Sequence, residues 1–391
     1  MADIFWAKPE DWKNLKVKSL PTPCYLVDFK LLKKNLEILN EVQEATGAKI
    51  LMAFKGFAMW STFPLARKYL KGIAASSQNE ARLGAEEFRK EVHTFSPAFK
   101  EDEFAEIMKY SNHIIFNSFE EWKRFRPALK KSRKKISVGL RVNPEHREVK
   151  VSLYDPSAPY SRLGITKKNF KAKELQGVSG LHFHALCELN ADSLERTLMA
   201  FERKFGEFLP KMKWVNFGGG HHITRPDYNR KLLVEIITRF KKKYPHLEVY
   251  LEPGEAIALN TGVLVARVLD IVHNEKRIAI LDTSAAAHMP DTLEMPYRPE
   301  IAGARPAGKY RYTYRLGGIS CLAGDVIGDY SFPKKLNRGD KLIFLDMAHY
   351  TMVKNNTFNG INLPSILIKD LKGKIKSIKK FGYEDYKNRL S

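Results

Sequence analysis

The stretch Leu51-Met52-Ala53-Phe54-Lys55-Gly56-Phe57-Ala58 places one lysine at the end of a short apolar run, with a glycine directly after it. A lysine among apolar residues tends to lose its proton, because burial disfavours the charged form. The neutral amine of Lys55 is then able to attack an aldehyde and form a Schiff base. A lysine at a strand end can also extend its charge into water, with only its methylene groups covered. The motif alone leaves both interpretations open.

Short strand and helix patterns alternate on both sides of Lys55 and predict the fold. About eight strand–helix units follow one another, which favours a closed parallel (β/α)8 TIM-like barrel over an open sheet. From about Val263 the pattern changes to strands, prolines and turns, which predicts a β-rich domain. We expect the barrel to span residues 30–262 and the β-rich domain to combine 1–29 with 263–391. Barrel strands are expected at 49–54, 72–75, 91–95, 113–116, 135–142, 180–184, 214–217 and 248–251.

The composition excludes several classes of protein. The 391 residues carry a formal charge of +22, but the basic residues are dispersed and no RNA-binding aromatic motif or finger spacing is present, so we expect no nucleic-acid partner. No apolar run approaches the roughly 18 residues of a membrane span, and residues 1–18 do not resemble a signal peptide. The three cysteines are far apart and form no CxxC pair, which favours the cytoplasm and argues against a metal site.

Polar residues gather at the ends of the expected barrel strands, where the chemistry of such barrels takes place. Gly218, Gly219 and Gly220 follow one strand, and consecutive glycines either cradle a phosphate with their amides or form only a tight turn. Glu252 ends the last strand, where a carboxylate caps a helix, joins a salt bridge or pairs with a protonated pyridine nitrogen. His184 is either a hydrogen-bonded core residue or a flat ring that stacks on another ring. Lys55 and Arg141 also fall at strand ends.

The order of motifs along the chain resembles the alanine-racemase-fold, ornithine/diaminopimelate decarboxylase group of pyridoxal-phosphate enzymes, which have fold type III. Stretches of the sequence also resemble a carboxynorspermidine/carboxyspermidine decarboxylase subfamily, namely Ala53 to Ala58, Glu252 to Ala256 and Pro290 to Pro299. The motifs that carry the resemblance to the group are Phe54-Lys55-Gly56, Ser161-Arg162-Leu163-Gly164, His182-Phe183-His184, Gly218-Gly219-Gly220, Glu252-Pro253-Gly254, Gly317-Gly318-Ile319-Ser320-Cys321 and Asp346-Met347-Ala348-His349-Tyr350.

The resemblance implies a role for each of these residues. Lys55 would hold pyridoxal 5'-phosphate covalently, and Glu252 would keep its pyridine nitrogen protonated. His184 would stack on the ring. The glycine turn (Gly218 to Gly220) and the Tyr350 hydroxyl would bind the phosphate, with Arg141 near the cofactor. Cys321 would reach across from the second subunit of a homodimer with shared active sites and would return a proton after carbon dioxide leaves; its other interpretation is a small buried hydrophobe.

The sequence also departs from the group pattern. Glu255 stands where related decarboxylases carry a phosphate-binding arginine, so we expect its carboxylate to turn away from the phosphate. Cys187 replaces a phosphate-binding serine, and Leu322 replaces an acidic residue after the active-site cysteine, which suggests a different grip on the substrate's distal end. The residues expected to contact the substrate are Glu294, Asp291, Asp325, Arg298 and Phe358.

The resemblance therefore implies a cytoplasmic carboxy-lyase that converts carboxynorspermidine or carboxyspermidine to norspermidine or spermidine in polyamine biosynthesis. Two alternatives stay open: a decarboxylase of diaminopimelate or ornithine, and a regulatory protein that carries the cofactor without turnover. The sequence does not separate the two carboxylated polyamines.

Overall fold

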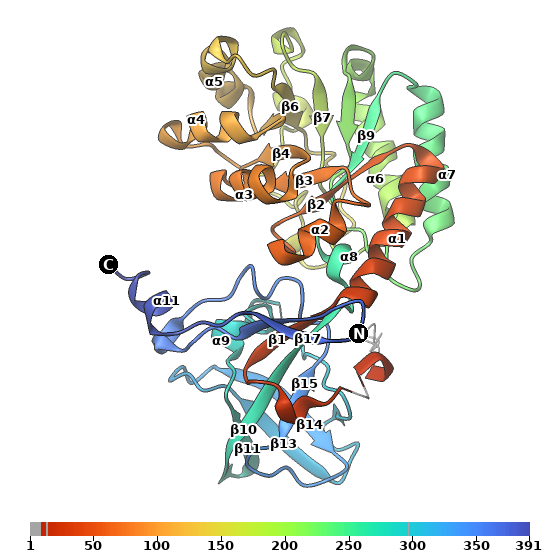
Figure 1. Cartoon of the computed structure of the whole chain (residues 1–391). Helices are drawn as coiled ribbons and strands as arrows, with labels where there is room; N and C mark the ends of the chain where they lie inside the picture. Colours follow the sequence, from red (N-terminus) through yellow and green to blue (C-terminus); the bar gives the residue numbers. More distant parts are fainter. Residues whose placement is uncertain (1–8, 13–14, 296) are drawn as a thin grey trace. The chain divides into compact units, whose positions relative to one another are not determined.

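The computed structural model describes residues 9–12, 15–295 and 297–391, which form two compact units (Figure 1). Lys33–Ile257 forms one unit, and the chain up to Leu32 forms the other together with Ala258–Ser391. The divisions fall inside helices α1 and α8.

The first unit contains a closed barrel of eight parallel strands, so the expected (β/α)8 barrel is confirmed (Figure 1). Each strand pairs with its neighbours in sequence, and β2 pairs with β9 to close the ring. The strands are β2 (Lys49–Ala53), β3 (Gly72–Ala75), β4 (Glu91–Phe95), β5 (His113–Phe116), β6 (Ser137–Arg141), β7 (Gly180–His182), β8 (Trp214–Asn216) and β9 (Glu248–Leu251).

Helices follow most of the strands and begin at residues suited to cap them. Ser118 accepts a hydrogen bond from the Glu121 amide at the start of α5, and Asp28 accepts bonds from the Lys30 and Leu31 amides at the start of α1. The helices are α1 (Phe29–Thr46), α2 (Phe63–Ala66), α3 (Gln78–Leu83), α4 (Glu101–Tyr110), α5 (Phe119–Lys131), α6 (Ala191–Phe205), α7 (Arg230–Lys243) and α8 (Glu255–Ala258).

The interior of the barrel is filled by side chains, and one of them explains two glycines. The Trp214 indole is buried, and a Cβ atom added at Gly180 would lie 2.1 Å from its ring. A Cβ at Gly139, on the next strand, would lie 2.3 Å from the same ring. These strands therefore carry glycine because the indole occupies the space of their side chains.

The second unit is built on a nine-stranded sheet with two buried apolar clusters. Strand β1 pairs in parallel with β16 and antiparallel with β10. The strands are β1 (Cys24–Asp28), β10 (Gly262–Asn274), β11 (Lys276–Leu281), β12 (Arg305–Pro306), β13 (Tyr312–Gly317), β14 (Val326–Phe332), β15 (Lys341–Phe344), β16 (Ser365–Lys369) and β17 (Ile375–Lys379), with short helices α9 (Ala285–His288), α10 (Asp291–Glu294) and α11 (Tyr383–Lys387).

Among the described residues, no helix is both long enough and apolar enough to cross a membrane.

Candidate active site

Lys55 lies directly after β2, where the chain turns. The Gly56 amide donates to the Ala53 carbonyl at 3.1 Å, and a Cβ at Gly56 would come within 3.0 Å of the Gly254 backbone. The Lys55 side chain is accessible to solvent, but protein surrounds it closely enough that burial, aided by the Arg141 charge, lowers the pKa of its amine. The amine makes no hydrogen bond or ion pair with any described residue. Lys55 is therefore placed to act as a nucleophile.

Glu252 follows β9 and is a buried anion. Its Oε1 accepts a hydrogen bond from Asn216 Nδ2 at 2.6 Å, and its Oε2 lies 3.3 Å from His182 Nε2. Burial alone would raise the pKa of this carboxyl, but His182 and the Asn216 amide outweigh it and the pKa falls to about 2. A fixed negative charge therefore lies among the strand ends at neutral pH.

His184 is held in one orientation by the glycine turn. Its Nδ1 accepts a hydrogen bond from the Gly219 amide at 2.9 Å, so the proton of the neutral ring is carried by Nε2. Burial, with Lys55 and Arg141 nearby, lowers the pKa of the imidazole well below its usual range, so the ring is uncharged. A neutral, oriented ring suits stacking on a flat ligand.

Arg141 ends β6 and links the same strand ends. Its Nη2 donates to the His184 carbonyl at 3.0 Å, and its guanidinium lies 4.6 Å from the centre of the Phe95 ring. Burial lowers the pKa of the guanidinium to about 10, so it stays charged at neutral pH. This charge helps to lower the pKa of the Lys55 amine.

The glycine turn differs from the expected three-amide cradle. The Gly218 amide donates to Asn216 Oδ1 at 2.8 Å, and the Gly219 amide donates to His184. Only the Gly220 amide has no acceptor within the described chain. The turn needs glycine for steric reasons: a Cβ at Gly219 or Gly220 would lie 2.1 Å or 1.8 Å from a neighbouring carbonyl oxygen. Two of the three expected phosphate donors are thus already occupied.

Glu255 turns toward the chain that follows the glycine turn. Its Oε2 lies 2.8 Å from the buried His222 Nε2. The group that balances this carboxylate is therefore a histidine.

In the second unit, Cys321 lies in an exposed loop that two side chains hold. The Cys321 amide donates to Asn359 Oδ1 at 2.8 Å, which ties this loop to the one that carries the half-exposed Phe358. Asp325 is buried, and its Oδ2 accepts bonds from the Ser320 amide at 3.1 Å and the Ser320 hydroxyl at 2.6 Å. Its Oδ1 accepts the Ala285 amide at 2.7 Å.

Asp325 already accepts hydrogen bonds within the protein, and its expected contact with the substrate stays a prediction. Both of its oxygens are satisfied by donors of the protein, so the carboxylate shapes the Cys321 loop and has little capacity left for a ligand.

Asp291 and Glu294 lie together on the short helix α10, and Lys354 forms an ion pair with both. Burial would lower the pKa of the Lys354 amine, but the two carboxylates raise it instead. The three side chains carry a net charge of about −1, so the pair can attract a further cation only in competition with Lys354.

The remaining expected residues lie elsewhere in the second unit. Arg298 places its guanidinium 4.6 Å from the centre of the Tyr330 ring. Tyr350 is partly buried, has a left-handed backbone with φ of 47°, and has its ring 6.1 Å from that of His349.

A separate group at the N-terminal ends of the barrel strands has metal-ligating side chains. Glu91, His93 and His113 offer ligand atoms within 4.8 Å of one another. However, the two imidazoles stack with their centres 3.8 Å apart, so their lone pairs do not converge, and Lys49 Nζ lies 3.0 Å from Glu91 Oε1. A bound ion would require the rings to turn and Lys49 to withdraw.

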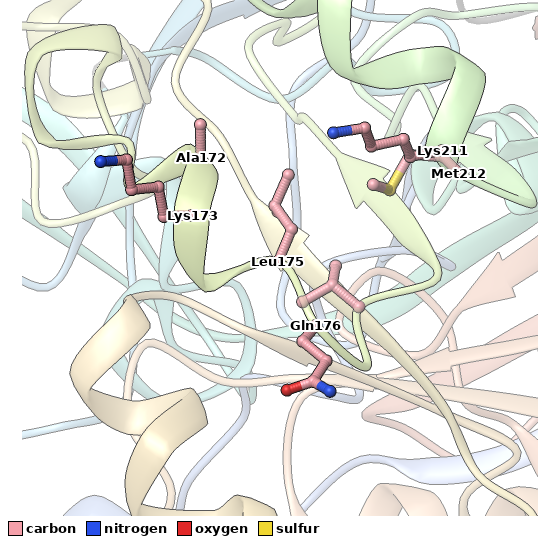
Figure 2. Close-up of a pocket in the computed structure, with 7 residues that line it drawn as sticks. Ala172, Lys173, Leu175, Gln176, Lys211 and Met212 are labelled. Carbon is pink, nitrogen blue, oxygen red and sulfur yellow. The ribbon is translucent and has the colours of Figure 1, made fainter.

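A surface pocket of about 530 Å³ also lies beside the N-terminal ends of β7 and β8 (Figure 2). It contains no carboxylate, imidazole or thiol that could take part in a reaction. Its lining consists of Ala172, Lys173, Leu175, Gln176, Val178, Lys211 and Met212.

Several residues of the site were missed at the level of sequence. His182 lies next to Glu252, but the sequence shows it only as part of a motif. Asn216 precedes the glycine turn, and no feature of the sequence distinguishes it. Lys354 and His222 have no local signal at all, because each is defined by a carboxylate far away in the chain. Asn359 follows the expected Phe358, and its left-handed φ of 56° suits an asparagine in a turn.

Comparisons with known proteins give this geometry a context. The family profile described as pyridoxal-dependent decarboxylase, C-terminal sheet domain, matches residues 24–348. The chain is 48% identical over 383 residues to a carboxynorspermidine/carboxyspermidine decarboxylase of Campylobacter jejuni, covering 95% of this chain and 99% of that protein. It is 45% identical over 379 residues to a carboxyaminopropylagmatine decarboxylase of Synechocystis, covering 97% of each.

A solved structure agrees with these relatives. The crystal structure of carboxynorspermidine decarboxylase complexed with norspermidine from Campylobacter jejuni matches with a TM-score of 0.88 and 48% identity, covering 95% of this chain and 100% of that chain.

Proposed function

Since the chain belongs to the pyridoxal-dependent Orn/DAP/Arg decarboxylase family, we propose that it decarboxylates carboxynorspermidine or carboxyspermidine in polyamine biosynthesis. The observation that carries this proposal is the match to the Campylobacter jejuni enzyme, which is 48% identical over nearly the whole of both chains. The products would be norspermidine and spermidine, and norspermidine is the molecule bound in the related crystal structure.

The residues present fit pyridoxal 5'-phosphate. Lys55 offers an amine without a partner among the described residues, and Glu252 offers a fixed negative charge. The Gly220 amide is available as a donor, and the close packing of the turn leaves no room for a side chain there. When bound, this cofactor supplies an electron sink for cleavage of the bond to the carboxyl group.

The chain's own residues would do the rest of the work. Lys55 would bind the cofactor's aldehyde carbon, because its lowered pKa keeps part of the amine neutral. Glu252 would hold the proton on the pyridine nitrogen, because a carboxylate whose pKa is about 2 does not take that proton itself. His184 would cover the ring as an uncharged partner. Cys321 of a second subunit would donate the proton that replaces carbon dioxide.

The polyamine end of the substrate would meet acidic side chains. Glu294 and Asp291 would contact its ammonium groups. Phe358 would form part of the wall of the substrate pocket, and Arg298 would bind the substrate carboxylate. Tyr350 would bind phosphate. Three free cysteines favour a reducing compartment, so we place the enzyme in the cytoplasm. The proposed role of Cys321 requires a second subunit, so the enzyme would act as a homodimer.

A second candidate substrate is carboxyaminopropylagmatine, since the Synechocystis relative is almost as similar as the Campylobacter jejuni enzyme. This compound ends in a guanidinium in place of an ammonium. A planar guanidinium favours bidentate pairing with a carboxylate, whereas an ammonium is a compact point charge. The acids of α10 could therefore distinguish the two.

The test is carbon dioxide release by the cofactor-loaded enzyme from carboxynorspermidine, carboxyspermidine, carboxyaminopropylagmatine, diaminopimelate and ornithine in parallel. We expect the first two to be turned over fastest and Lys55→Ala to abolish both turnover and the visible absorbance of the bound cofactor. Turnover of diaminopimelate or ornithine alone would overturn the substrate assignment. Cofactor binding without turnover of any compound would favour a regulatory protein.

A further inference from the structure

His222 is a buried imidazole that the reaction described above does not use. It lies two residues after the glycine turn, is 4% exposed, and its amide donates to the Leu189 carbonyl at 3.3 Å. Its Nε2 lies 2.8 Å from Glu255 Oε2. Both ring nitrogens are buried, and neither meets the geometry of a hydrogen bond within the described part of the chain. The Nε2 edge therefore faces a carboxylate at ion-pair distance, whereas the Nδ1 edge has no acceptor among the described residues.

The charges around His222 favour its protonated form. Glu255 and Glu188 act in that direction, while Arg225 and burial oppose it and the neighbouring His221 is itself an uncharged ring. The balance raises the pKa of His222 above its ordinary value, despite the burial. When the ring is protonated both nitrogens carry protons, and Nδ1–H is then a buried, charged donor without an acceptor among the described residues. Such donors are rare in folded proteins unless a ligand satisfies them.

Two segments bring this donor to the candidate cofactor site. His222 lies two residues after Gly220, whose amide also lacks an acceptor in the part of the chain that the structure describes. Glu255 follows Gly254, whose backbone packs against Gly56 beside Lys55. A positive charge and a free amide on one turn are the elements of an anion site.

We propose that His222, clamped by Glu255, is a phosphate-recognition residue whose Nδ1–H donates, together with the Gly220 amide, to the phosphate of the bound cofactor. This inference rests on the proposed function, because it requires pyridoxal phosphate in the site. Glu255 lies at ion-pair distance from Nε2 and favours the protonated ring.

Two substitutions separate this role from a purely structural ion pair. In His222→Asn the side-chain amide takes the place of Nδ1, whereas in His222→Gln it takes the place of Nε2, next to Glu255. A phosphate role requires the Nδ1 donor, so the Asn variant should keep more of it. A structural ion pair requires the Nε2 contact, so the Gln variant should be the better tolerated. The matched control is His221→Gln, a buried neighbour whose Nδ1 lies 3.2 Å from the Tyr228 hydroxyl.

The measurement is the dissociation constant of the apoenzyme for pyridoxal phosphate and for pyridoxal, which lacks the phosphate. We expect His222→Gln to lower the preference for pyridoxal phosphate about tenfold or more, since charge-assisted hydrogen bonds are strong, while binding of pyridoxal is unchanged. His222→Asn should lose less, and His221→Gln should keep the wild-type preference. An equal loss for both ligands, or a preference retained in His222→Gln, would overturn the proposal.

A second readout applies if the histidine variants fold poorly. Glu255→Gln leaves the imidazole but removes the carboxylate, so the preference for pyridoxal phosphate should be lost at a lower pH than in the wild type. A wild-type pH dependence in Glu255→Gln would contradict the clamp. If the wild-type protein binds no pyridoxal phosphate through Lys55, the proposed function fails; if it binds and turns over substrate but His222→Gln keeps its preference, only this inference fails.

Discussion

At the scale of single residues, the site is a set of charges whose states are fixed by their neighbours. The pKa of Lys55 is lowered, while Arg141 stays cationic and Glu252 stays anionic, although all three are surrounded by protein. The partner determines the outcome: Glu252 has Asn216 and His182 beside it, whereas Lys55 has no acceptor among the described residues. The same barrel end thus provides a nucleophile and a counter-ion.

Glu252→Gln tests the anionic role. Glutamine keeps the size of the side chain but cannot stabilise a protonated pyridine nitrogen, so we expect kcat to fall on the order of 100-fold, the size of loss seen when one charge-stabilising group is removed from an active site. Cofactor should still bind to Lys55. The matched control is Glu248→Gln, at the opposite end of the same strand, which should keep its activity. Equal kcat values in the two variants would contradict the role of Glu252.

Among the secondary-structure elements, the short helix α10 carries the two carboxylates that we expect to bind a cationic substrate. Its four residues place Asp291 and Glu294 where a single lysine contacts both. Lys354 already pairs with both carboxylates. A substrate ammonium that reaches them must therefore displace the Lys354 ammonium or share the carboxylates with it.

Lys354→Met tests this competition. The substitution frees both carboxylates, so we expect KM for the polyamine substrate to fall several-fold and to depend more strongly on salt. Lys276→Met is the control, since Lys276 pairs with Asp329 at 3.0 Å in the same unit but away from α10. A higher KM in Lys354→Met than in Lys276→Met would mean that the lysine orients the acids rather than competing for them.

At the scale of the whole molecule, buried histidines make stability depend on pH. Burial lowers the pKa of His113 to about 2 and of His221 and His288 to about 4, and it also lowers those of His182 and His184. The unfolded chain binds these protons near pH 6.5, so it is favoured as the pH falls below that value. His222, with its raised pKa, acts in the opposite direction but is a single residue.

We therefore expect the free energy of unfolding of the cofactor-loaded enzyme to fall from pH 7 to pH 5.5, by up to about 1.4 kcal/mol per pH unit for each such histidine. Urea unfolding at several pH values measures the slope. His113→Asn should reduce it by about one proton, and the exposed His273→Asn should leave it unchanged. Stability that is constant or rises over this range would contradict the prediction.

The proposed shared site also makes a prediction for the assembly. Lys55→Ala and Cys321→Ala chains, each impaired alone, should regain about a quarter of wild-type activity when mixed, because random exchange makes half of the dimers hybrids with one intact site. Mixing Lys55→Ala with Glu252→Gln should restore nothing, since both residues lie on the barrel unit. Absence of recovery in the first mixture would contradict a site shared between subunits.

The sequence by itself determined the barrel, the β-rich sheet and the positions of the reactive side chains, because these depend on local periodicity and on where each strand ends. Lys55, Glu252 and the glycine turn could be chosen in this way. The sequence did not show which donors were already taken. From the sequence, the amides of Gly218, Gly219 and Gly220 are equally good candidates to donate to a phosphate.

Only the tertiary structure decided the pairings. Asn216 meets Glu252 across 36 positions, and Lys354 meets Asp291 across 63. Such contacts form only when neighbouring strands of the barrel pair or the loops of the sheet unit come together, and no local pattern encodes them. They determine which groups stay free for a ligand: both oxygens of Asp325 already accept bonds within the protein, whereas His222 is a candidate for binding phosphate.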